Sequence, residues 1–476
     1  MILQNISNGA IKAVSNVCVR QKKRNGNKCT RRLYMALPRL TPQEVTTVLQ
    51  TNEYTKEFNG QSSVKYYDSN QLPSNNPIED ARSEAQCLFT KGILLGVFDG
   101  HGGDACAQVI SKRLFHYISA CLLPKKLLKQ YLNTVNSDNK LELLQMFNDR
   151  TEFISENKDL YQASFLSFMK DLADNECTTE FQMETALENA FMRLDNDLSN
   201  EALLNLGKKN TKKFLEIATS GAVAAVAHID GPHLHVAGVG DCQAVLGTLS
   251  EEDGWSAKLM TVEHNTDNRA EVERILSEHP PNERSTIIKM ERLLGQLAPL
   301  RSLGDFQYKW NKKTLREVAP YIGEAMIPPN YHTPPYLTAK PEVKYHRLTP
   351  RDKFLIIASD GLWDLISPLE GVRLVGEHMS GKVTLSSLRL PCRNMKLSDI
   401  NKMLVQRKEG LKKKPLDSNA ATHLLRHALG GTDYGIDHGK LSRLLTLSSP
   451  VVRIFRDDIT ITVVYMDSEY LRHCPP

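Results

Sequence analysis

Acidic residues recur at the ends of apolar stretches along this chain. Asp99, Asp241 and Asp360 each stand at the end of a short apolar run. A carboxylate in such a place is held by the strand, while its oxygens face the loops beyond the strand end. Several carboxylates that meet in one place repel each other unless cations neutralise them. The pattern therefore indicates a site for divalent cations.

Two more acidic pairs belong to this set. Glu79-Asp80 precedes the first apolar run and Asp457-Asp458 precedes the last. No Cys and His spacing typical of zinc occurs, and an all-oxygen set favours Mg²⁺ or Mn²⁺. Two such ions that share a carboxylate lower the pKa of a water and place it in line with a phosphorus atom. His101, in the first of these loops, is then placed to protonate a departing alkoxide.

Each of these residues also has a plainer interpretation. Asp-Gly after a strand is usually a turn, and a lone histidine in a loop is usually structural or solvated. Leu362 and Trp363, beside Asp360, are more typical of a core than of a substrate contact. The functional interpretation therefore rests on the joint occurrence of the acids in one order.

The strands that must position these groups are predicted from apolar runs bounded by turn residues. They are Gly92–Phe98, Ser220–Ile229, His233–Val239, Gln243–Thr248, Lys353–Ser359 and Ile459–Met466. Apolar residues three or four apart predict helices up to about Leu123, over Thr179–Leu204 and over Asn419–Leu429. The last helix is expected to have Ser418 as its N-cap and Gly430 as its stop. Ser69–Pro77, rich in Ser, Asn and Pro, is expected to be a loop.

Composition bounds the class of protein. The 476 residues are 41% hydrophobic and 24% charged, which is typical of a folded globular chain, and a net charge of +5 does not imply a nucleic-acid partner. The longest apolar run, Ser220 to Ile229, is too short for a transmembrane segment. The nine cysteines include no CxxC pair, which favours a reducing compartment.

The N-terminal segment differs from the rest. No Asp or Glu occurs before Glu44, whereas Lys and Arg are frequent. This composition predicts a mitochondrial transit peptide over residues 1–40, with a disordered basic tail or an RNA-binding arm as alternatives. A catalytic domain is expected over 41–470, with insertions near 265–335 and 381–415, the second of which carries ten Lys or Arg residues.

Taken together, the motifs resemble those of the PPM-type metal-dependent protein serine/threonine phosphatases. The matching segments are Ile78–Asp80, Val97–Gly103, Ser220–Ala222, Val239–Asp241, Ser302–Asp305, Ala358–Asp364 and Arg456–Thr460. The resemblance implies an α+β fold, a four-layer α-β-β-α sandwich of two antiparallel sheets flanked by helices. It also implies two Mg²⁺ or Mn²⁺ ions in a cleft at one end, and direct attack on phosphorus by a hydroxide that bridges them.

The resemblance implies roles for the matching residues. Asp99 would bridge the two ions, while Asp360 and Asp457 would hold the first. Glu79 and the carbonyl of Gly100 would hold the second ion. The chain is expected to carry the complete ligand set, because every metal-associated acid of the family pattern is present.

Other matching positions have supporting roles. Asp80 would orient the ligands, Asp241 and Asp364 match a third, weaker metal site, and His101 is the candidate general acid. One position departs from the family pattern, because better-known members hold the substrate phosphate with an arginine where this chain has Asn75. An amide lacks the charged, bidentate fork of arginine. Phosphate capture is therefore expected to rest more on the metals or on another base.

Further blocks are similar to the mitochondrial pyruvate dehydrogenase phosphatase branch of that family. They are Asp68–Pro73, Pro328–Ala339 and Asn419–Leu424. This similarity implies a matrix enzyme that removes phosphate from serines of the pyruvate dehydrogenase decarboxylase component and so activates the complex. It also implies docking on the lipoyl domain of the acetyltransferase core with help from Ca²⁺, and a regulatory subunit. Two alternatives stay open, namely a phosphatase for another mitochondrial protein such as branched-chain keto-acid dehydrogenase, and a catalytically silent scaffold.

Overall fold

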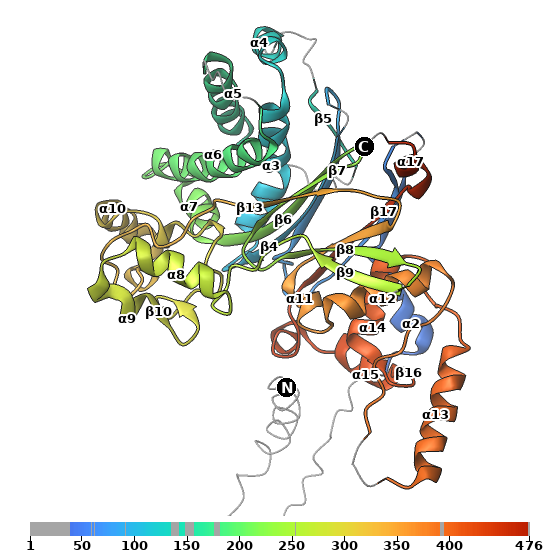
Figure 1. Ribbon diagram of the computed structural model, residues 1–476. Helices are drawn as coiled ribbons and strands as arrows, with labels where there is room; N and C mark the ends of the chain where they lie inside the picture. Colours follow the sequence, from blue (N-terminus) through green and yellow to red (C-terminus); the bar gives the residue numbers. More distant parts are fainter. Residues whose placement is uncertain are drawn as a thin grey trace, which may run out of the picture.

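The computed structural model describes residues 39–474, apart from short gaps at 59, 61, 91, 135–141, 148–156, 176–180, 253 and 391–394. Two antiparallel sheets lie face to face, and helices cover the outer side of each (Figure 1). The predicted α-β-β-α sandwich is therefore confirmed. The predicted leader lies outside the described residues except for its last two positions.

The first sheet has the strand order β1-β2-β17-β14-β8-β9, and each neighbouring pair is antiparallel. Its strands are β1 (Tyr54–Glu57), β2 (Val64–Leu72), β8 (Gln243–Ser250), β9 (Gly254–Leu259), β14 (Asp352–Ala358) and β17 (Ile459–Met466). The strand β17 comes from the end of the chain, yet it lies inside the sheet between β2 and β14.

The second sheet has the order β13-β7-β6-β4-β3-β5, and the short β12 pairs with β6. Its strands are β3 (Ala81–Cys87), β4 (Ile93–His101), β5 (Leu144–Met146), β6 (Gly221–Asp230), β7 (His233–Val239), β12 (Leu303–Gly304) and β13 (Glu342–Arg347). Two small hairpins lie outside both sheets, β10–β11 (Ile288–Lys289 and Arg292–Leu293) and β15–β16 (Gly431–Thr432 and Gly435–Ile436).

The helices form the two outer layers. Those packed with the second sheet are α3 (Ala105–Leu122), α4 (Lys125–Thr134), α5 (Lys158–Asp174), α6 (Met183–Leu204) and α7 (Thr211–Thr219). Those on the first sheet are α2 (Pro42–Gln50), α11 (Asp360–Trp363), α12 (Pro368–Met379), α14 (Ala420–Gly430) and α15 (His438–Leu445). The remaining helices are α8 (Arg269–Glu278), α9 (Arg284–Ile287), α10 (Lys312–Ile322), α13 (Leu397–Leu411), α16 (Ser449–Val452) and α17 (Ser468–Arg472).

Strand β14 shows why the sandwich forms. Phe354 and Ile356 belong to the core beneath α12 and α14, whereas Leu355 and Ile357 belong to the core between the sheets. Successive side chains of a strand point to opposite faces, so β14 is apolar on both. Complete burial of each such side chain contributes roughly 1.5–3 kcal/mol. This is why the strand was predictable as an unbroken apolar run.

The strand ends that carry the acidic residues lie at one end of the sandwich. In the second sheet Phe98 of β4 pairs with Ala81 of β3, so the end of β4 adjoins the start of β3. In the first sheet Ala358 of β14 pairs with Ile461 of β17, so the end of β14 adjoins the start of β17. The antiparallel order thus gathers residues from distant parts of the chain.

All six predicted strands are confirmed, but two local predictions are wrong. The stretch Ser69–Pro77 is not all loop, because β2 continues to Leu72. Buried Asn70 is satisfied there, since its Nδ2 donates to the Leu49 carbonyl and to Thr422 Oγ1, both at 2.7 Å. A polar sequence can form a strand when the rest of the fold supplies partners.

The second wrong prediction concerns the start of α14. The N-cap is Asn419, whose Oδ1 accepts a hydrogen bond from the Thr422 backbone N at 3.1 Å, whereas Ser418 is exposed. Gly430 is the last residue of the helix, and Gly431 is its C-cap.

The two segments predicted as insertions differ in their relation to the sheets. Segment 265–335 contains α8, α9 and α10, but it also supplies β12, which pairs with β6. Segment 381–415 contains α13, which extends away from the sandwich (Figure 1). No helix in the described residues is long and apolar enough to cross a membrane.

Candidate active site

Carboxylates from both sheets meet at the end of the sandwich described above. Asp99 lies near the end of β4, Asp241 follows β7, and Asp360 begins α11 after β14. Asp80 precedes β3 and Asp457 precedes β17. Asp99 lies within the electrostatic reach of Asp80, Asp360 and Asp241, and Asp360 within that of Asp457. The structure therefore brings these five predicted residues together.

The proximity of these acids affects their pKa values. Burial, followed by the charges of Asp80, Asp360 and Asp241, raises the pKa of Asp99 well above its usual range. Burial and the neighbouring acids raise the pKa of Asp360 to about 8. Burial is also the main cause that raises the pKa of Asp80 to about 7 and that of Asp241 to about 6. These carboxylates cannot all ionise at neutral pH without compensating cations.

The chemistry of this set fits divalent ions. Oδ1 of Asp360 is buried and has no hydrogen-bond partner among the described residues, which is costly unless another ligand satisfies it. In the described residues, no three His, Cys, Asp or Glu side chains lie so that they could hold a metal ion by themselves. Mg²⁺ usually keeps several waters and takes only one or two protein carboxylates. The spread of the acids is therefore compatible with hydrated Mg²⁺ or Mn²⁺ ions.

Asp80 joins the two sheets rather than facing the solvent. Its carboxylate is buried, and Oδ2 accepts a hydrogen bond from Ser359 Oγ at 2.9 Å. The backbone N of Thr460 donates to the same Ser359 hydroxyl at 3.0 Å. Asp80 is therefore placed to orient the surrounding groups, and it fixes the second sheet against β14 and β17 of the first.

Glu79 is held at both carboxylate oxygens. Oε1 accepts a hydrogen bond from the Gly103 backbone N at 2.8 Å, and Oε2 accepts one from Asn75 Nδ2 at 2.9 Å. The same Nδ2 of Asn75 also donates to Asp458 Oδ2 at 2.9 Å. The amide of Asn75 is thus directed at two carboxylates, so its N–H groups are already used within the protein.

Asp458 organises the loop before β3, a role that was not predicted from the sequence. Its buried carboxylate accepts hydrogen bonds from the backbone N of Ser74, of Asn75 at 2.9 Å and of Glu79 at 2.8 Å. The side chain of Asp457 is 44% exposed. The two neighbours therefore differ in burial, and only Asp457 lies open to a ligand.

Arg453 is the main site residue that sequence reasoning missed. Its Nη1 lies 2.7 Å from Glu79 Oε2 and 3.4 Å from Asp457 Oδ1, and its side chain is 46% exposed. Arg456, by contrast, donates to the carbonyls of Leu72 and Pro73. Arg453 lies four residues before Asp457 but just beyond the end of α16, so no helical pattern in the sequence marked it.

His101 is paired with a carboxylate from the segment predicted as an insertion. Its Nε2 lies 2.6 Å from Asp305 Oδ2, and Ser302 Oγ donates to the same oxygen at 2.7 Å. Burial alone lowers the pKa of His101, but the charge and hydrogen bond of Asp305 outweigh it and raise that pKa above the usual value. The Ser302–Asp305 motif was recognised in the sequence, yet its contact with His101 was not foreseen.

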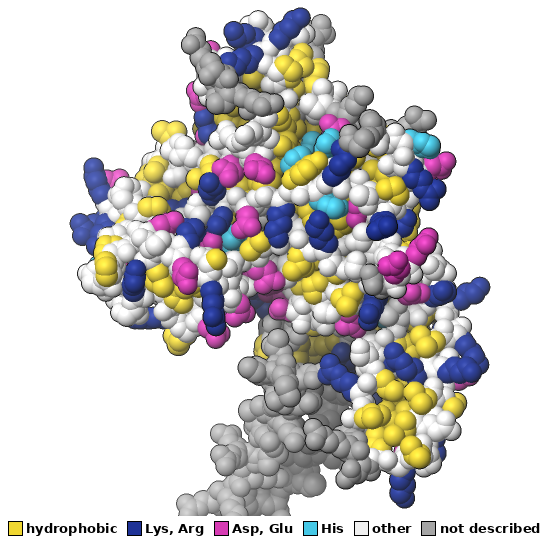
Figure 2. Space-filling model, viewed as in Figure 1, with side chains coloured by type: hydrophobic (Ala, Val, Ile, Leu, Met, Phe, Trp, Pro, Cys, Tyr) yellow, Lys and Arg dark blue, Asp and Glu magenta, His cyan; other side chains and the backbone are white. Residues whose placement is uncertain are grey.

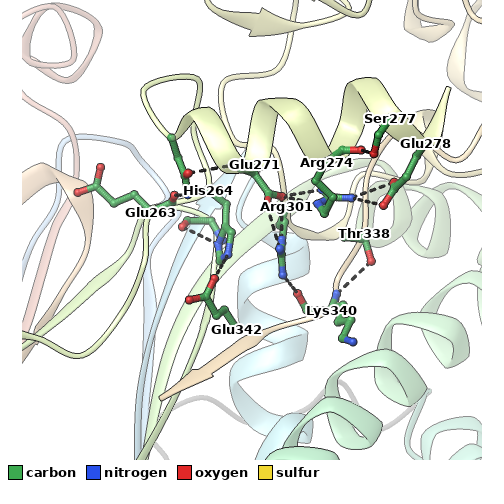
Figure 3. Close-up of polar contacts among 12 residues, drawn as sticks. Glu263, His264, Glu271, Arg274, Ser277, Glu278, Arg301, Thr338, Lys340 and Glu342 are labelled. Carbon is green, nitrogen blue, oxygen red and sulfur yellow. Dashed lines mark hydrogen bonds and ion pairs between the residues drawn. The ribbon is translucent and has the colours of Figure 1, made fainter. Parts of the chain in front are cut away.

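The turn after β7 is braced by His264, which stands directly before segment 265–335. The backbone N of Gly240 donates to His264 Nδ1 at 3.1 Å, and the Leu300 N donates to the His264 carbonyl at 2.7 Å. Beyond it, Arg301 donates to both carboxylate oxygens of Glu271 at 2.8 Å (Figure 3). These contacts run from α8 to the turn at Gly240. They therefore hold the backbone directly before Asp241 in place.

The remaining predicted residues lie in the same region. Asp364 is the C-cap of α11, and burial together with the charge of Asp457 raises its pKa. Gly100 lies so close to the Glu79 carbonyl that an added Cβ would collide with it. A glycine is therefore required where the loop before β3 crosses the end of β4.

Comparison with known families identifies the class of protein. Residues 163–400 match Protein phosphatase 2C. The chain belongs to the protein phosphatase 2C family, a metal-dependent family of protein phosphatases. The resemblance inferred from the motifs is confirmed.

Within this family, the chain is similar to phosphatases named for one substrate. It is 44% identical over 461 residues to mitochondrial [pyruvate dehydrogenase [acetyl-transferring]]-phosphatase 1 of Bos taurus, covering 92% of this chain and 85% of the relative. Phosphatase 2 of Homo sapiens is 41% identical over 447 residues, covering 90% and 84%. Phosphatase 1 of Saccharomyces cerevisiae is 28% identical over 470 residues, covering 90% and 73%.

Proposed function

We propose that this chain is a mitochondrial matrix phosphatase that removes phosphate from serines of the pyruvate dehydrogenase decarboxylase component and so activates the complex. The observation that carries the proposal is the meeting of carboxylates from both sheets around the unpartnered Oδ1 of Asp360. The relatives are named for this substrate, and this chain aligns with most of the length of each. Their names therefore support the substrate assignment.

The carboxylates are the proposed metal ligands. Two Mg²⁺ or Mn²⁺ ions, when bound, would neutralise the acids and lower the pKa of a water that attacks phosphorus directly. Asp99 is proposed to bridge the two ion positions, as the family resemblance implies, and the charges of acids from both sheets act on it. The other proposed ligands are Asp360 and Asp457 for one ion, Glu79 and the Gly100 carbonyl for the other, and Asp241 and Asp364 for a third, weaker site.

His101 is proposed to protonate the departing serine oxygen. Asp305 holds one nitrogen of its ring at 2.6 Å and so fixes the ring plane relative to Asp99, two residues earlier on β4. Positioned proton transfer of this kind typically contributes 10²- to 10⁴-fold to the rate.

Arg453 is proposed to take the role of the arginine that Asn75 replaces. Asn75 donates to Glu79 and Asp458, whereas the half-exposed Arg453 stands at the mouth of the site. A guanidinium presents a planar fork of donors that matches two phosphate oxygens. Its ion pair with Glu79 is partly exposed to water and therefore weak, so the guanidinium is able to turn toward a substrate.

The partners belong to the same proposal. Docking on the lipoyl domain of the acetyltransferase core, a requirement for Ca²⁺ and pairing with a regulatory subunit are implied by the resemblance to this branch. A phosphatase for branched-chain keto-acid dehydrogenase and a silent scaffold are the competing functions. The relatives' names disfavour the first, and the complete set of acids disfavours the second.

The deciding experiment measures phosphate release from phosphorylated pyruvate dehydrogenase complex by the full chain with Mg²⁺, with and without a chelator. Asp99→Asn is expected to lower kcat/KM by at least about 100-fold, because it removes the charge shared by both ion positions. Asp267→Asn, an exposed aspartate in segment 265–335, is the matched control and is expected to leave the rate unchanged.

The outcomes separate the alternatives. Release that requires the metal and is lost only in Asp99→Asn supports both the chemistry and the substrate. If the wild-type chain hydrolyses p-nitrophenyl phosphate but not the complex, the substrate assignment is wrong. If it is inert on both with metal present, the scaffold function replaces the proposal.

A further inference from the structure

Helix α13 is attached to the molecule along one side only. Within Leu397–Leu411 the single buried residue is Gly410, which lies against the backbone of Tyr434. Arg407 fixes the same side, because its Nη1 donates to the carbonyls of Ser386 and Asp433, each at 2.7 Å. The helix itself extends away from the sandwich, as Figure 1 shows.

The side of the helix next to Arg407 carries a row of leucines, since Leu404 and Leu411 lie three and four residues from it. Leu397, Leu404 and Leu411 are 84%, 49% and 48% exposed. Residues seven apart lie nearly above one another on a helix, so the three form one narrow apolar stripe. In Figure 2 hydrophobic side chains gather where α13 lies, with Lys and Arg around them. Exposed leucines aligned in this way are typical of a surface that another chain covers.

The positive charge of segment 381–415 indicates the charge of the partner. Segment 381–415 contains ten Lys or Arg and two acidic residues, an excess of eight positive charges. The two acids, Asp399 and Glu409, are already paired with Lys402 and Lys412 on the helix itself. Opposite charge across an interface guides association and fixes register, so the complementary surface is acidic.

The narrow width of the leucine stripe indicates the shape of the partner surface. A helix that lies in a membrane surface needs a broad apolar face, whereas a seam one leucine wide is typical of contact with one other helix. We propose that the exposed side of α13 binds an acidic amphipathic helix of a partner protein. With 15 residues, α13 offers only about two heptads, or about 22 Å. The contact is therefore weak and reversible.

The test uses a defined probe and the full chain. The probe is a fluorescein-labelled helical peptide of about three heptads, with Leu at the seam and Glu at the flanking positions. Its anisotropy is expected to rise in the micromolar range of protein and to respond to salt. Leu404→Asp is expected to weaken binding at least about 10-fold, because it places a charge in the apolar seam facing acidic residues.

Leu259→Asp is the matched control, because Leu259 on the edge strand β9 is also 49% exposed. It is expected to bind the probe like the wild-type chain. Both variants are expected to hydrolyse p-nitrophenyl phosphate at the wild-type rate, which shows that they are folded. The same peptide with Lys in place of Glu is expected not to bind.

Three results would overturn the proposal. The first is equal binding of the acidic probe by Leu404→Asp and the wild-type chain. The second is equal binding of the acidic and basic peptides, or of neither. The third is binding to vesicles of phosphatidylcholine and phosphatidylglycerol without binding to the peptide, which would assign α13 to a membrane surface.

Discussion

Gly221 is the first residue of β6, and it lies opposite His101 in the register of the second sheet. A Cβ at this position would collide with the His101 imidazole and with the Asp305 carboxylate. The hydrogen bond between these two side chains therefore exists because residue 221 has no side chain. A residue remote in the sequence and without chemistry of its own thus controls the position of the candidate general acid.

Replacing this glycine tests the role of the pair. Gly221→Ala is expected to lower kcat on a phosphoserine peptide about 100-fold, because a misplaced His101 cannot protonate an alkoxide. The rate on p-nitrophenyl phosphate is expected to change little, since nitrophenolate leaves without a proton. Gly60→Ala, where an added methyl group meets nothing within 4 Å, is the control. Equal losses on both substrates would show that the substitution damages the site in general.

Arg453 allows a second test at the level of one side chain. Arg453→Ala is expected to raise KM for a phosphoserine peptide about 10-fold with a smaller effect on kcat, because it removes a charged hydrogen bond to phosphate. Arg453→Lys is expected to recover only part of the loss, since lysine lacks the fork. The exposed Arg316 on α10 supplies the control, Arg316→Ala. An unchanged KM in Arg453→Ala would place phosphate capture elsewhere.

At the scale of elements, burial decided what the sequence could predict. Strands β7 and β17 were predicted residue for residue, because their apolar runs end at turn residues. The strands β1, β2 and β3 were not predicted, since polar residues dominate them and their buried polar groups find partners only in the folded chain. Glu84 of β3 is an example, because it is fully buried beside Arg82. A strand that buries paired charges in this way shows no alternation of apolar and polar residues in its sequence.

The start of α14 gives a test at this scale. Asn419 caps the helix and also donates through Nδ2 to the Tyr54 carbonyl and to Thr55 Oγ1. Asn419→Ala is expected to lower the free energy of unfolding by about 2 kcal/mol, because it removes the cap and these buried contacts. Ser418→Ala is expected to have no effect, and urea denaturation of both variants would measure the difference. Equal stability of the two variants would contradict the assignment of the cap.

The candidate site was more predictable than the contacts that hold it. The acids Asp99, Asp241 and Asp360 were found because each ends an apolar run, and the family resemblance added their order. The roles of Arg453 and Asp305 in the site were not predicted. Each contacts a residue more than 200 positions away in the sequence, Glu79 and His101 respectively. Only the packing of the two sheets brings such partners together, and one sequence contains no record of that packing.

For the whole molecule, buried histidines make stability depend on pH. His228 on β6 is 6% exposed, and neither ring nitrogen has a hydrogen-bond partner among the described residues. Burial, followed by the charge of His235, lowers its pKa from 6.5 to about 4. The unfolded chain therefore takes up this proton first as the pH falls. The stability that neutral His228 provides is complete above pH 6.5, and it is lost as the pH falls from there toward 4.

The loss can be measured by denaturation at several pH values. Between about pH 7.5 and pH 5 the wild-type chain is expected to lose about 2 kcal/mol through His228. His228→Leu is expected to remove that part of the pH dependence, whereas His473→Leu, at an exposed position, is expected to leave it. An unchanged slope in His228→Leu would show that His228 is not neutral in the folded state.

The place of β17 in the first sheet has a consequence for the protein during its synthesis. This last strand fills the gap between β2 and β14, and Asp457 stands directly before it. A chain still growing on the ribosome has neither a closed first sheet nor a complete set of these acids until β17 has been synthesised. Domains fold as units once their sequence is available. The acidic site is therefore assembled only after β17 has joined the first sheet, however much of the rest of the chain has already folded.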